Sequence, residues 1–246
     1  MAGTKAIIYS MGLWLGKLLH NNNQSKVLYY HDVHQDNDTP VTDMSTAMSL
    51  FAAHIKTIRA HGFEIVDEIT HPEKQILISF DDGYTGIYKN RDFFIREGIK
   101  PTVFLVTSSI GTDTFMDEEQ ILFLKDKGFI FQSHTHTHPL LPTLSEEQLK
   151  EEFLTSKNIL ENLLSEEVTG ICFPEGLFSS KVTRVAKACG YKNLYCSIPG
   201  NYFEMNKFGT VQRNLAQFIT TSDLEYVLHG GSVFYQKRYS KQHFSN

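Results

Sequence analysis

The sequence predicts an α/β domain built on a parallel sheet, and a closed barrel of about seven strand–helix units fits it best. Three observations support this prediction. Segments typical of strands and of helices alternate through nearly the whole chain. The strand candidates are continuous apolar runs, as in strands that are covered on both faces. The length of 246 residues suits a single barrel. A doubly wound open sheet is the alternative, because periodicity does not separate the two architectures.

Residues 1–25 are expected to form a lead-in helix and a polar linker, followed by the barrel domain over residues 26–246. The run from Ile7 to Leu19 is apolar, is interrupted by Lys17 and carries large side chains at helical spacing. It is too short to cross a bilayer, and no small-residue cleavage site follows it. We therefore favour a helix that packs on the domain or contacts a membrane surface, and export is the less favoured interpretation.

The barrel domain begins with a short buried strand and continues with alternating elements. Ser45 is a candidate N-cap for a helix that ends near Gly62, and Ser145 with Gln148 has the spacing of a capping box. The expected strands cover 26–30, 63–66, 75–80, 102–106, 129–131, 170–173, 193–196 and 211–215. The other expected helices cover 88–96, 117–127, 145–164, 181–189 and 222–228.

Composition excludes several classes of protein. A net charge of −5 without a basic cluster argues against a nucleic-acid partner. Hydrophobic residues make up 41% and charged residues 21% of the chain, which is typical of a folded domain. The three cysteines have no CxxC spacing, so neither a disulfide framework nor a thiolate zinc site is expected. We expect a cytoplasmic protein, peripheral to the inner membrane if its first helix contacts lipid.

Two adjacent carboxylates, Asp81 and Asp82, follow the strand candidate over 75–80 and precede Gly83. If both are buried they repel each other, unless a cation binds one of them and favours the charge of the other. Gly83 permits a sharp turn that brings both side chains to one site. The alternative is a plain Asp-Asp-Gly turn ahead of a helix, which is common.

Three histidines at alternate positions, His134, His136 and His138, follow the strand candidate over 129–131. Two imidazoles four residues apart can meet one ion if the backbone curls after the strand, and His136 is then a bystander. The alternative is a solvated loop without a ligand. Because all strands of a parallel barrel end at one rim, the aspartates and histidines are expected close together.

An aspartate and two histidines at one rim form a three-ligand site with open positions, which is typical of catalytic rather than structural metal centres. The spare carboxylate is a candidate general base. Such a site suits the hydrolysis of an amide or an ester.

These segments resemble the motifs of the polysaccharide deacetylase family, also known as NodB-like or carbohydrate esterase family 4. Residues 78–83 (ISFDDG) are similar to its first motif and residues 134–139 (HTHTHP) to its second. Residues 27–31 (VLYYH) are similar to the opening strand of the poly-N-acetylglucosamine deacetylase branch. Residues 102–106 (TVFLV) match the strand between the two motifs, and the resemblance covers roughly residues 26–228.

The resemblance implies a distorted (β/α)7 barrel of the TIM-like, NodB-homology type. It implies a divalent metal, commonly Zn²⁺ with Co²⁺, Mn²⁺ or Ni²⁺ as alternatives, held by Asp82, His134 and His138. Asp81 would be the general base. The implied enzyme is a hydrolase of non-peptide carbon–nitrogen bonds, which removes acetate from an N-acetylated sugar or its precursor in surface-polysaccharide metabolism.

The sequence departs from the family at the third motif, which usually reads Arg-x-Pro-(Tyr/Phe)-Gly. Cys172 stands in place of the arginine and Glu175 in place of the aromatic residue. A thiol cannot hold a carboxylate as a guanidinium does, so another group must orient Asp81. Arg213, in a late strand candidate, is one such group.

The general acid is a second open point. His229 follows a leucine, as the acid of the last family motif does, but it lies at the end of a predicted helix. His31 is the rival candidate, because it follows the first strand and should lie on the same rim. The candidate residues for substrate contact are Tyr84, Pro174, Glu175 and Arg213.

Two other functions remain open. A metal-dependent amidohydrolase for a non-sugar amide is one, because Glu175 would change the pocket. A non-catalytic barrel that binds carbohydrate is the other, favoured if no general acid is present. In the leading interpretation the partner is an N-acetylated carbohydrate, and no nucleic acid is involved.

Overall fold

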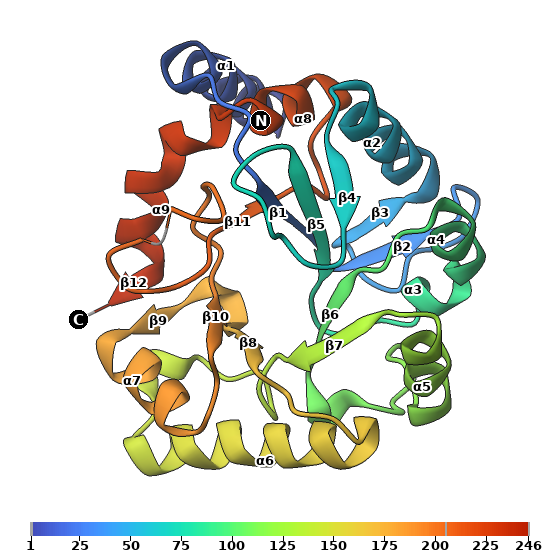
Figure 1. The fold of residues 1–246 in the computed structure, drawn as a ribbon, viewed down its shortest axis with the longest axis vertical. Coiled ribbons are helices and arrows are strands. Elements are labelled where there is room, and N and C mark those ends of the chain that lie inside the picture. Colours follow the sequence, from blue (N-terminus) through green and yellow to red (C-terminus); the bar gives the residue numbers. More distant parts are fainter. Residues whose placement is uncertain (1, 205, 246) are drawn as a thin grey trace.

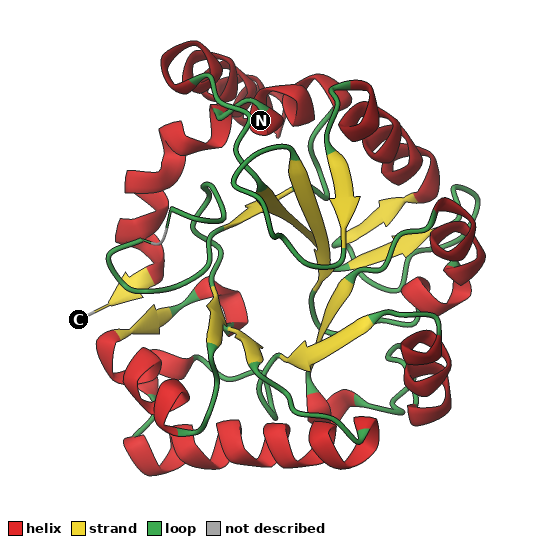
Figure 2. Cartoon of the chain, in the orientation of Figure 1, coloured by secondary structure: helices red, strands yellow, loops and turns green. Residues whose placement is uncertain are grey.

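Parallel strands run around a nearly closed barrel in the order β10-β8-β7-β6-β5-β1-β11 (Figures 1 and 2). The computed structural model describes residues 2–204 and 206–245. Backbone hydrogen bonds close the ring, from Val211 N to Leu194 O (2.7 Å) and from Cys196 N to Val211 O (3.0 Å). The predicted barrel is confirmed, and the open-sheet alternative is wrong. The strands are β1 (Lys26–Tyr30), β5 (Gln75–Phe80), β6 (Thr102–Leu105), β7 (Ile130–Ser133), β8 (Gly170–Cys172), β10 (Asn193–Tyr195) and β11 (Arg213–Leu215).

Shorter strands attach to this ring. β4 (Glu64–Val66) pairs with the first half of β5, whereas β6 pairs with its end, at Ser79 and Phe80. Two small parallel sheets lie apart from the barrel and consist of β2 (Asp32–His34) with β3 (Ser45–Ala47) and of β9 (Phe178–Ser179) with β12 (Phe244–Ser245).

The predicted N-cap at Ser45 is wrong, because this residue belongs to β3 and α2 begins three residues later without a side-chain cap. The Ser45 hydroxyl instead donates to Asp32 Oδ2 at 2.7 Å. Its side chain therefore joins β3 to β2 rather than satisfying the amide groups of the helix.

Helices surround the barrel (Figure 2). The helix predicted over 88–96 is two short helices that meet at Asn90, whose side-chain amide donates to Gly86 O (2.9 Å) and Val33 O (3.2 Å). α9 was not predicted, because it carries no buried side chain and therefore no apolar periodicity. The helices are α1 (Ala2–His20), α2 (Met48–Ala60), α3 (Gly86–Lys89), α4 (Arg91–Glu97), α5 (Glu118–Asp126), α6 (Glu146–Leu164), α7 (Ser180–Ala188), α8 (Thr221–Leu228) and α9 (Gln236–His243), with 3-10 turns η1 (Thr107–Ser109), η2 (Leu141–Thr143), η3 (Pro174–Gly176) and η4 (Gly231–Tyr235).

A large apolar core fills the layer between the barrel and its helices. Its aromatic centre contains Phe80 of β5 with Phe51 of α2 and Phe94 of α4, all fully buried and with ring centroids 5.4–5.8 Å apart. Burying one such side chain stabilises the fold by about 2–3 kcal/mol. These contacts fix α2 and α4 against β5, the strand that carries the two aspartates at its end.

The N-terminal helix packs on the barrel domain. Leu13 of α1 is fully buried and belongs to the main core, and Lys17 forms an ion pair with Glu225 of α8 (2.6 Å). None of the helices in the described ranges is long and apolar enough to cross a membrane. Helix α1 and the linker after it are thus a covering element of the barrel.

Candidate active site

The carboxyl ends of the barrel strands meet around a cavity of about 310 Å³. Segments that are distant in the sequence meet there, because parallel strands all present their carboxyl ends to one rim. Six residues singled out from the sequence line the cavity: His31, Asp81, Asp82, His134, His138 and Glu175.

The turn after β5 places the two aspartates. Asp81 N donates to Tyr30 O (3.0 Å) and Gly83 N donates to Asp81 O (2.9 Å). Asp82 has the left-handed conformation (φ 71°), which is unusual for a residue with a side chain. Gly83 has φ 93°, which other residues rarely adopt, and a Cβ atom here would lie 2.5 Å from Leu105 Cδ2, so glycine is strongly favoured. This strained turn points both carboxylates into the same cavity.

The loop after β7 curls as the spacing of its histidines predicted. Thr135 and His138 both have positive φ (70° and 59°), and His138 N donates to Thr135 Oγ1 (3.1 Å). Glu152 of α6 accepts hydrogen bonds from the backbone N atoms of His136 and Thr137, each at 2.9 Å. The curl is therefore held by a carboxylate on a separate helix.

Asp82, His134 and His138 offer ligand atoms to a common point. Asp82 Oδ1 lies 3.5 Å from His134 Nε2 and 3.6 Å from His138 Nε2, and all three ligand atoms lie within 4.8 Å of one another. Ligands about 2.1 Å from a tetrahedral ion would be about 3.4 Å apart. His136 turns away, because its Nδ1 bonds to Thr107 Oγ1 (2.9 Å). The spacing fits a divalent metal.

The His134 ring is prepared for such a role by its surroundings. Its Nδ1–H donates to Cys172 O (2.8 Å), which leaves the Nε2 lone pair facing Asp82. Burial lowers the pKa of His134, against the opposing charges of Asp81 and Asp82. The neutral imidazole is thereby favoured, which is the form that binds a metal.

Asp81 is held by Arg213 at the centre of the barrel. Two parallel hydrogen bonds, Nη1 to Oδ1 (2.6 Å) and Nη2 to Oδ2 (2.7 Å), join two side chains that are at most 4% exposed. Burial alone would raise the pKa of Asp81, but the charge and hydrogen bonds of Arg213 outweigh it and hold this pKa well below its usual range. Because both of its oxygens bond to a guanidinium, Asp81 is less suited than Asp82 to bind a metal.

Cys172 takes the position of the family arginine without its function. Its Sγ accepts a hydrogen bond from Arg213 Nη2 at 2.8 Å and lies 3.7 Å from Asp81 Oδ2. Burial raises the pKa of the Cys172 thiol well above its usual value, so it stays protonated and is no nucleophile. The guanidinium comes from β11 instead of β8 and reaches the same carboxylate.

The two candidates for the general acid lie in different places. His31 lines the cavity, and its Nδ1 bonds to Gln217 Oε1 at 2.5 Å, which leaves Nε2 to exchange a proton. His229 follows α8 and bonds to His61 (3.0 Å) and to Asn23 (2.9 Å), which precedes β1 at the opposite end of the barrel. His229 therefore does not line the cavity, because a helix carries the chain away from the rim.

Three of the residues predicted to contact substrate do not line this cavity. Arg213 is fully buried beneath Asp81, so it positions that carboxylate and does not reach a ligand. Tyr84 stacks on Phe115 (ring centroids 4.6 Å apart) and does not line the cavity. Pro174 is buried in η3, whereas the next residue, Glu175, is exposed at the cavity with φ 55°.

Several cavity residues were not predicted. Gln217 and Phe218 follow β11, so the rule that chemistry collects after strands could have found them. His243 at the end of α9 bonds to Gly176 O (3.2 Å), and no sequence pattern marked this helix. Met44 and Ser197 also line the cavity and were not predicted.

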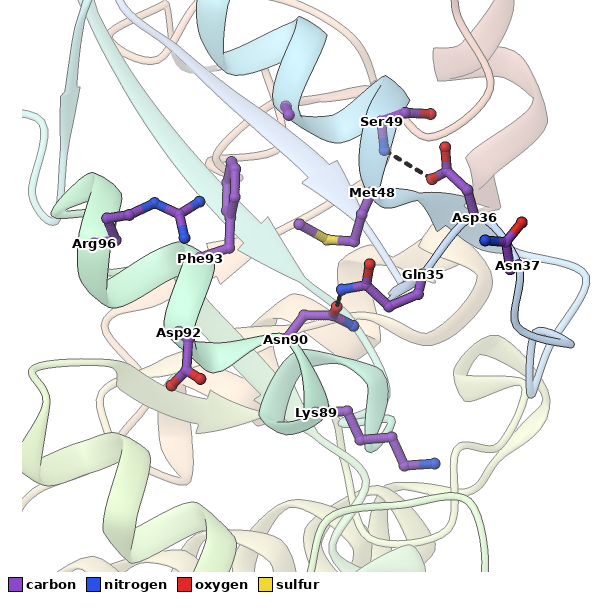
Figure 3. A pocket seen from close by; sticks show the side chains of 11 residues that line it. Gln35, Asp36, Asn37, Met48, Ser49, Lys89, Asn90, Asp92, Phe93 and Arg96 are labelled. Carbon is purple, nitrogen blue, oxygen red and sulfur yellow. Dashed lines mark hydrogen bonds between the residues drawn. The ribbon is translucent and has the colours of Figure 1, made fainter.

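A second cavity, of about 580 Å³, lies outside the barrel between α2 and α4 (Figure 3). Its polar side chains serve the local fold. Asp36 accepts a hydrogen bond from Ser49 N at the start of α2 (3.0 Å), and Gln35 donates to Asn90 Oδ1 (2.5 Å). The described residues that line it include none of those predicted to act in chemistry, so the rim cavity is the candidate site.

Known proteins resemble this chain in sequence. A family model described as polysaccharide deacetylase matches residues 68–194. The chain is 28% identical over 185 residues to YxkH of Bacillus subtilis (strain 168), which carries the name of a polysaccharide deacetylase; the match covers 71% of this chain and 64% of that protein. It is 26% identical over 128 residues to the peptidoglycan-N-acetylmuramic acid deacetylase PdaA of the same organism. That match covers 51% of this chain and 48% of PdaA. The chain thus spans less than two thirds of the length of these relatives.

Solved structures share the fold. The Streptococcus pyogenes deacetylase PplD, in complex with acetate, superposes with a TM-score of 0.74 at 20% identity, covering 83% of this chain and 98% of that one. IcaB from Ammonifex degensii superposes with a TM-score of 0.73 at 19% identity, and the match covers 86% of this chain and 98% of that one.

Proposed function

The chain belongs to the polysaccharide deacetylase family, and we propose that it hydrolyses the acetamide group of an N-acetylated sugar with the help of a divalent metal. The observation that carries this proposal is the meeting of Asp82, His134 and His138 within 4.8 Å, beside an ionised Asp81, in one cavity. Three ligands with open positions are typical of catalytic sites.

The donor set fits Zn²⁺, because two imidazoles and one carboxylate are its common ligands. When bound, such an ion polarises a carbonyl oxygen and lowers the pKa of water. Asp82, His134 and His138 would hold it, and the bond from His134 Nδ1 to Cys172 O fixes the first ring. The neighbouring group of Asp81, His134 and Cys172 is less suitable, because a guanidinium already bonds to both Asp81 and Cys172.

Asp81 would accept the proton of the attacking water. Its bond to Arg213 keeps it ionised at neutral pH, and each of its oxygens retains a second lone pair for this proton. A carboxylate with a low pKa is a weak base, so it depends on the lowered pKa of the water. Its position matters most, and Arg213 fixes that position.

His31 would donate a proton to the nitrogen that leaves. Its ring lines the cavity but does not belong to either candidate group of metal ligands. The Gln217 side chain holds the ring through Nδ1. An amine is a poor leaving group unless it is protonated, so a positioned acid contributes about 10²–10⁴ to the rate.

The cavity mouth suits a sugar. Phe218 is 61% exposed there and offers a ring face on which a pyranose can stack. Glu175, also exposed at the mouth, offers a carboxylate that accepts hydrogen bonds from hydroxyl groups. These two residues support an N-acetylated carbohydrate as the substrate class.

Acetate release tests the proposal. The metal-loaded protein is incubated with N-acetylglucosamine oligomers, beside Asp81→Asn and the control Asp126→Asn, which changes an exposed aspartate of α5. We expect release from the wild type and the control, and a loss of about 10²-fold or more in Asp81→Asn. Release only from small non-sugar amides would favour an amidohydrolase. Oligomer binding without release in any variant would favour a non-catalytic barrel.

A further inference from the structure

Helix α1 exposes a continuous apolar surface. Seven of its large hydrophobic side chains are 38–63% exposed, and they make up seven of the sixteen large exposed hydrophobic residues in the described parts of the chain. They recur at intervals of three and four residues and therefore share one face of the helix. We call this face the α1 stripe: Ile7, Ile8, Met11, Trp14, Leu15, Leu18 and Leu19.

The opposite face of α1 is already packed, so the stripe cannot turn inward. A Cβ atom at Gly12 would lie 1.9 Å from Tyr235 Oη, and one at Gly16 would lie 2.1 Å from Gly231 O. Lys17 pairs with Glu225, and Ser10 donates to Asp223 Oδ1 (2.5 Å). The packed face of α1 is thus already occupied by the barrel domain, whereas its most apolar face is exposed to solvent.

Charge is unevenly distributed around this helix. Residues 1–31 and 226–246 together contain six lysines and arginines and no aspartate or glutamate. Residues 32–225 contain the other 17 cations and all 28 carboxylates, which gives that segment a net charge of −11. The first and last segments lie side by side, because α1 packs against η4 and α8 (Figure 1). Asp223 and Glu225 of α8 also contact α1, and six cations against these two carboxylates still leave a net charge of +4 in this part of an acidic protein.

We propose that the α1 stripe docks on the surface of a bilayer that contains anionic lipids. The helix would lie in the interface with its apolar side chains among the acyl chains, because none of the described helices meets the combined length and hydropathy needed to cross. Exposed cations on the adjacent α9, Lys237, Arg238 and Lys241, would face anionic headgroups. Trp14, 50% exposed on the stripe, suits the interfacial region, where tryptophan is enriched.

Charge favours a lipid surface over a second copy of the chain. In a two-fold symmetric dimer the same patch meets itself, so the basic residues of one α9 would approach those of the other. An anionic membrane instead attracts them, at about 1 kcal/mol or roughly fivefold in affinity per cation.

Docking would also bring the rim cavity near the lipid. α9 begins beside η4 and ends at His243, which lines that cavity, and a helix of eight residues is about 12 Å long. The site would then face sugars carried on the same membrane. This consequence rests on the proposed function, whereas docking itself does not.

Vesicle binding tests docking without any substrate. Trp14 is the single tryptophan of the chain, so its emission reports directly on the stripe. The full chain is mixed with vesicles of phosphatidylcholine alone or with phosphatidylglycerol added, and bound protein is separated by sedimentation. We expect cosedimentation and a blue shift of Trp14 emission with the anionic vesicles, both reduced at high salt.

Matched variants test whether the α1 stripe and the cations of α9 form the contact with the vesicle. Ile8→Gln/Leu18→Gln removes two stripe residues but keeps Trp14, and should lower vesicle affinity at least about tenfold. The control Leu140→Gln/Leu154→Gln changes two residues of similar exposure (50% and 42%) away from α1 and should bind as the wild type does. Lys237→Gln/Lys241→Gln should lower binding to anionic vesicles about 25-fold.

Three outcomes would overturn the proposal. The protein stays in the supernatant with unchanged Trp14 emission; or it binds vesicles but Ile8→Gln/Leu18→Gln binds equally well; or sedimentation velocity shows a dimer that this variant dissociates. The last result would assign the stripe to a second copy. Circular dichroism of each variant establishes that it is folded before it is compared.

Discussion

Arg213 donates two parallel hydrogen bonds to Asp81, at 2.6 and 2.7 Å, although 132 residues separate them in the sequence. The guanidinium also lies over the ring of Tyr29, 4.3 Å from its centroid, and neither charged side chain is more than 4% exposed. The barrel interior thus contains an ion pair with favourable geometry, positioned directly beneath the candidate metal ligands.

Removing the arginine should destabilise the protein strongly. Arg213→Met leaves the Asp81 carboxylate buried without a compensating charge, and we expect the free energy of unfolding to fall by about 3–5 kcal/mol in urea denaturation. The double variant Asp81→Asn/Arg213→Met should recover part of this loss, because the uncompensated charge is gone. A loss below about 1 kcal/mol in the single variant would show that the pair contributes little.

Metal binding should distinguish two histidines of one loop. Adding Zn²⁺ at about 100 times its dissociation constant stabilises the folded state by about 2.7 kcal/mol, which for a chain of this size raises Tm by roughly 5–10 °C. We expect this rise in the wild type and in His136→Ala, whose ring bonds to Thr107. His138→Ala should lack it. An equal rise in all three proteins would place the metal elsewhere.

The general acid can be tested with the two histidines that the sequence left open. His31→Gln should lower kcat for acetate release by about 10²–10⁴, since His31 lines the cavity. His229→Gln is the control, because His229 bonds to His61 and Asn23 away from the site. If His31→Gln keeps the full rate, another group supplies the proton.

Lys26 should make stability depend on pH. It is fully buried, and burial, assisted by the charge of Lys74, lowers its pKa from 10.5 to about 7, against the opposing charge of Glu204. Between these values the unfolded chain holds a proton that the folded chain has released, so the free energy of unfolding rises with pH.

The variant Lys26→Met lacks this proton and isolates its effect. Between about pH 7 and pH 9.5, the wild type should gain up to about 3 kcal/mol relative to Lys26→Met in urea denaturation. A difference that stays constant over this range would contradict the lowered pKa. The test depends on how the difference in the free energy of unfolding changes with pH, and not on which protein is more stable at pH 7.

The sequence alone predicted the buried parallel strands and the candidate metal ligands for local reasons, and the resemblance of its motifs favoured a barrel over an open sheet. Continuous apolar runs fix buried parallel strands, and a parallel barrel presents all strand ends at one rim. Asp82, His134 and His138 each follow such a strand within a few residues, so their meeting required only the topology and the resemblance of their motifs. The Ser145 capping box was likewise visible, because it depends on residues three apart.

Tertiary structure decided the contacts between residues that are far apart. Whether Arg213 or another cation orients Asp81 depends on two strands being neighbours across the barrel, and the same geometry buries Arg213 away from the substrate. His229 and His243 both end helices, yet only His243 reaches the cavity, because α8 leads away from the rim and α9 returns to it. Local pattern specifies elements, whereas the direction in which each element leaves the sheet is set by packing, which no single segment encodes.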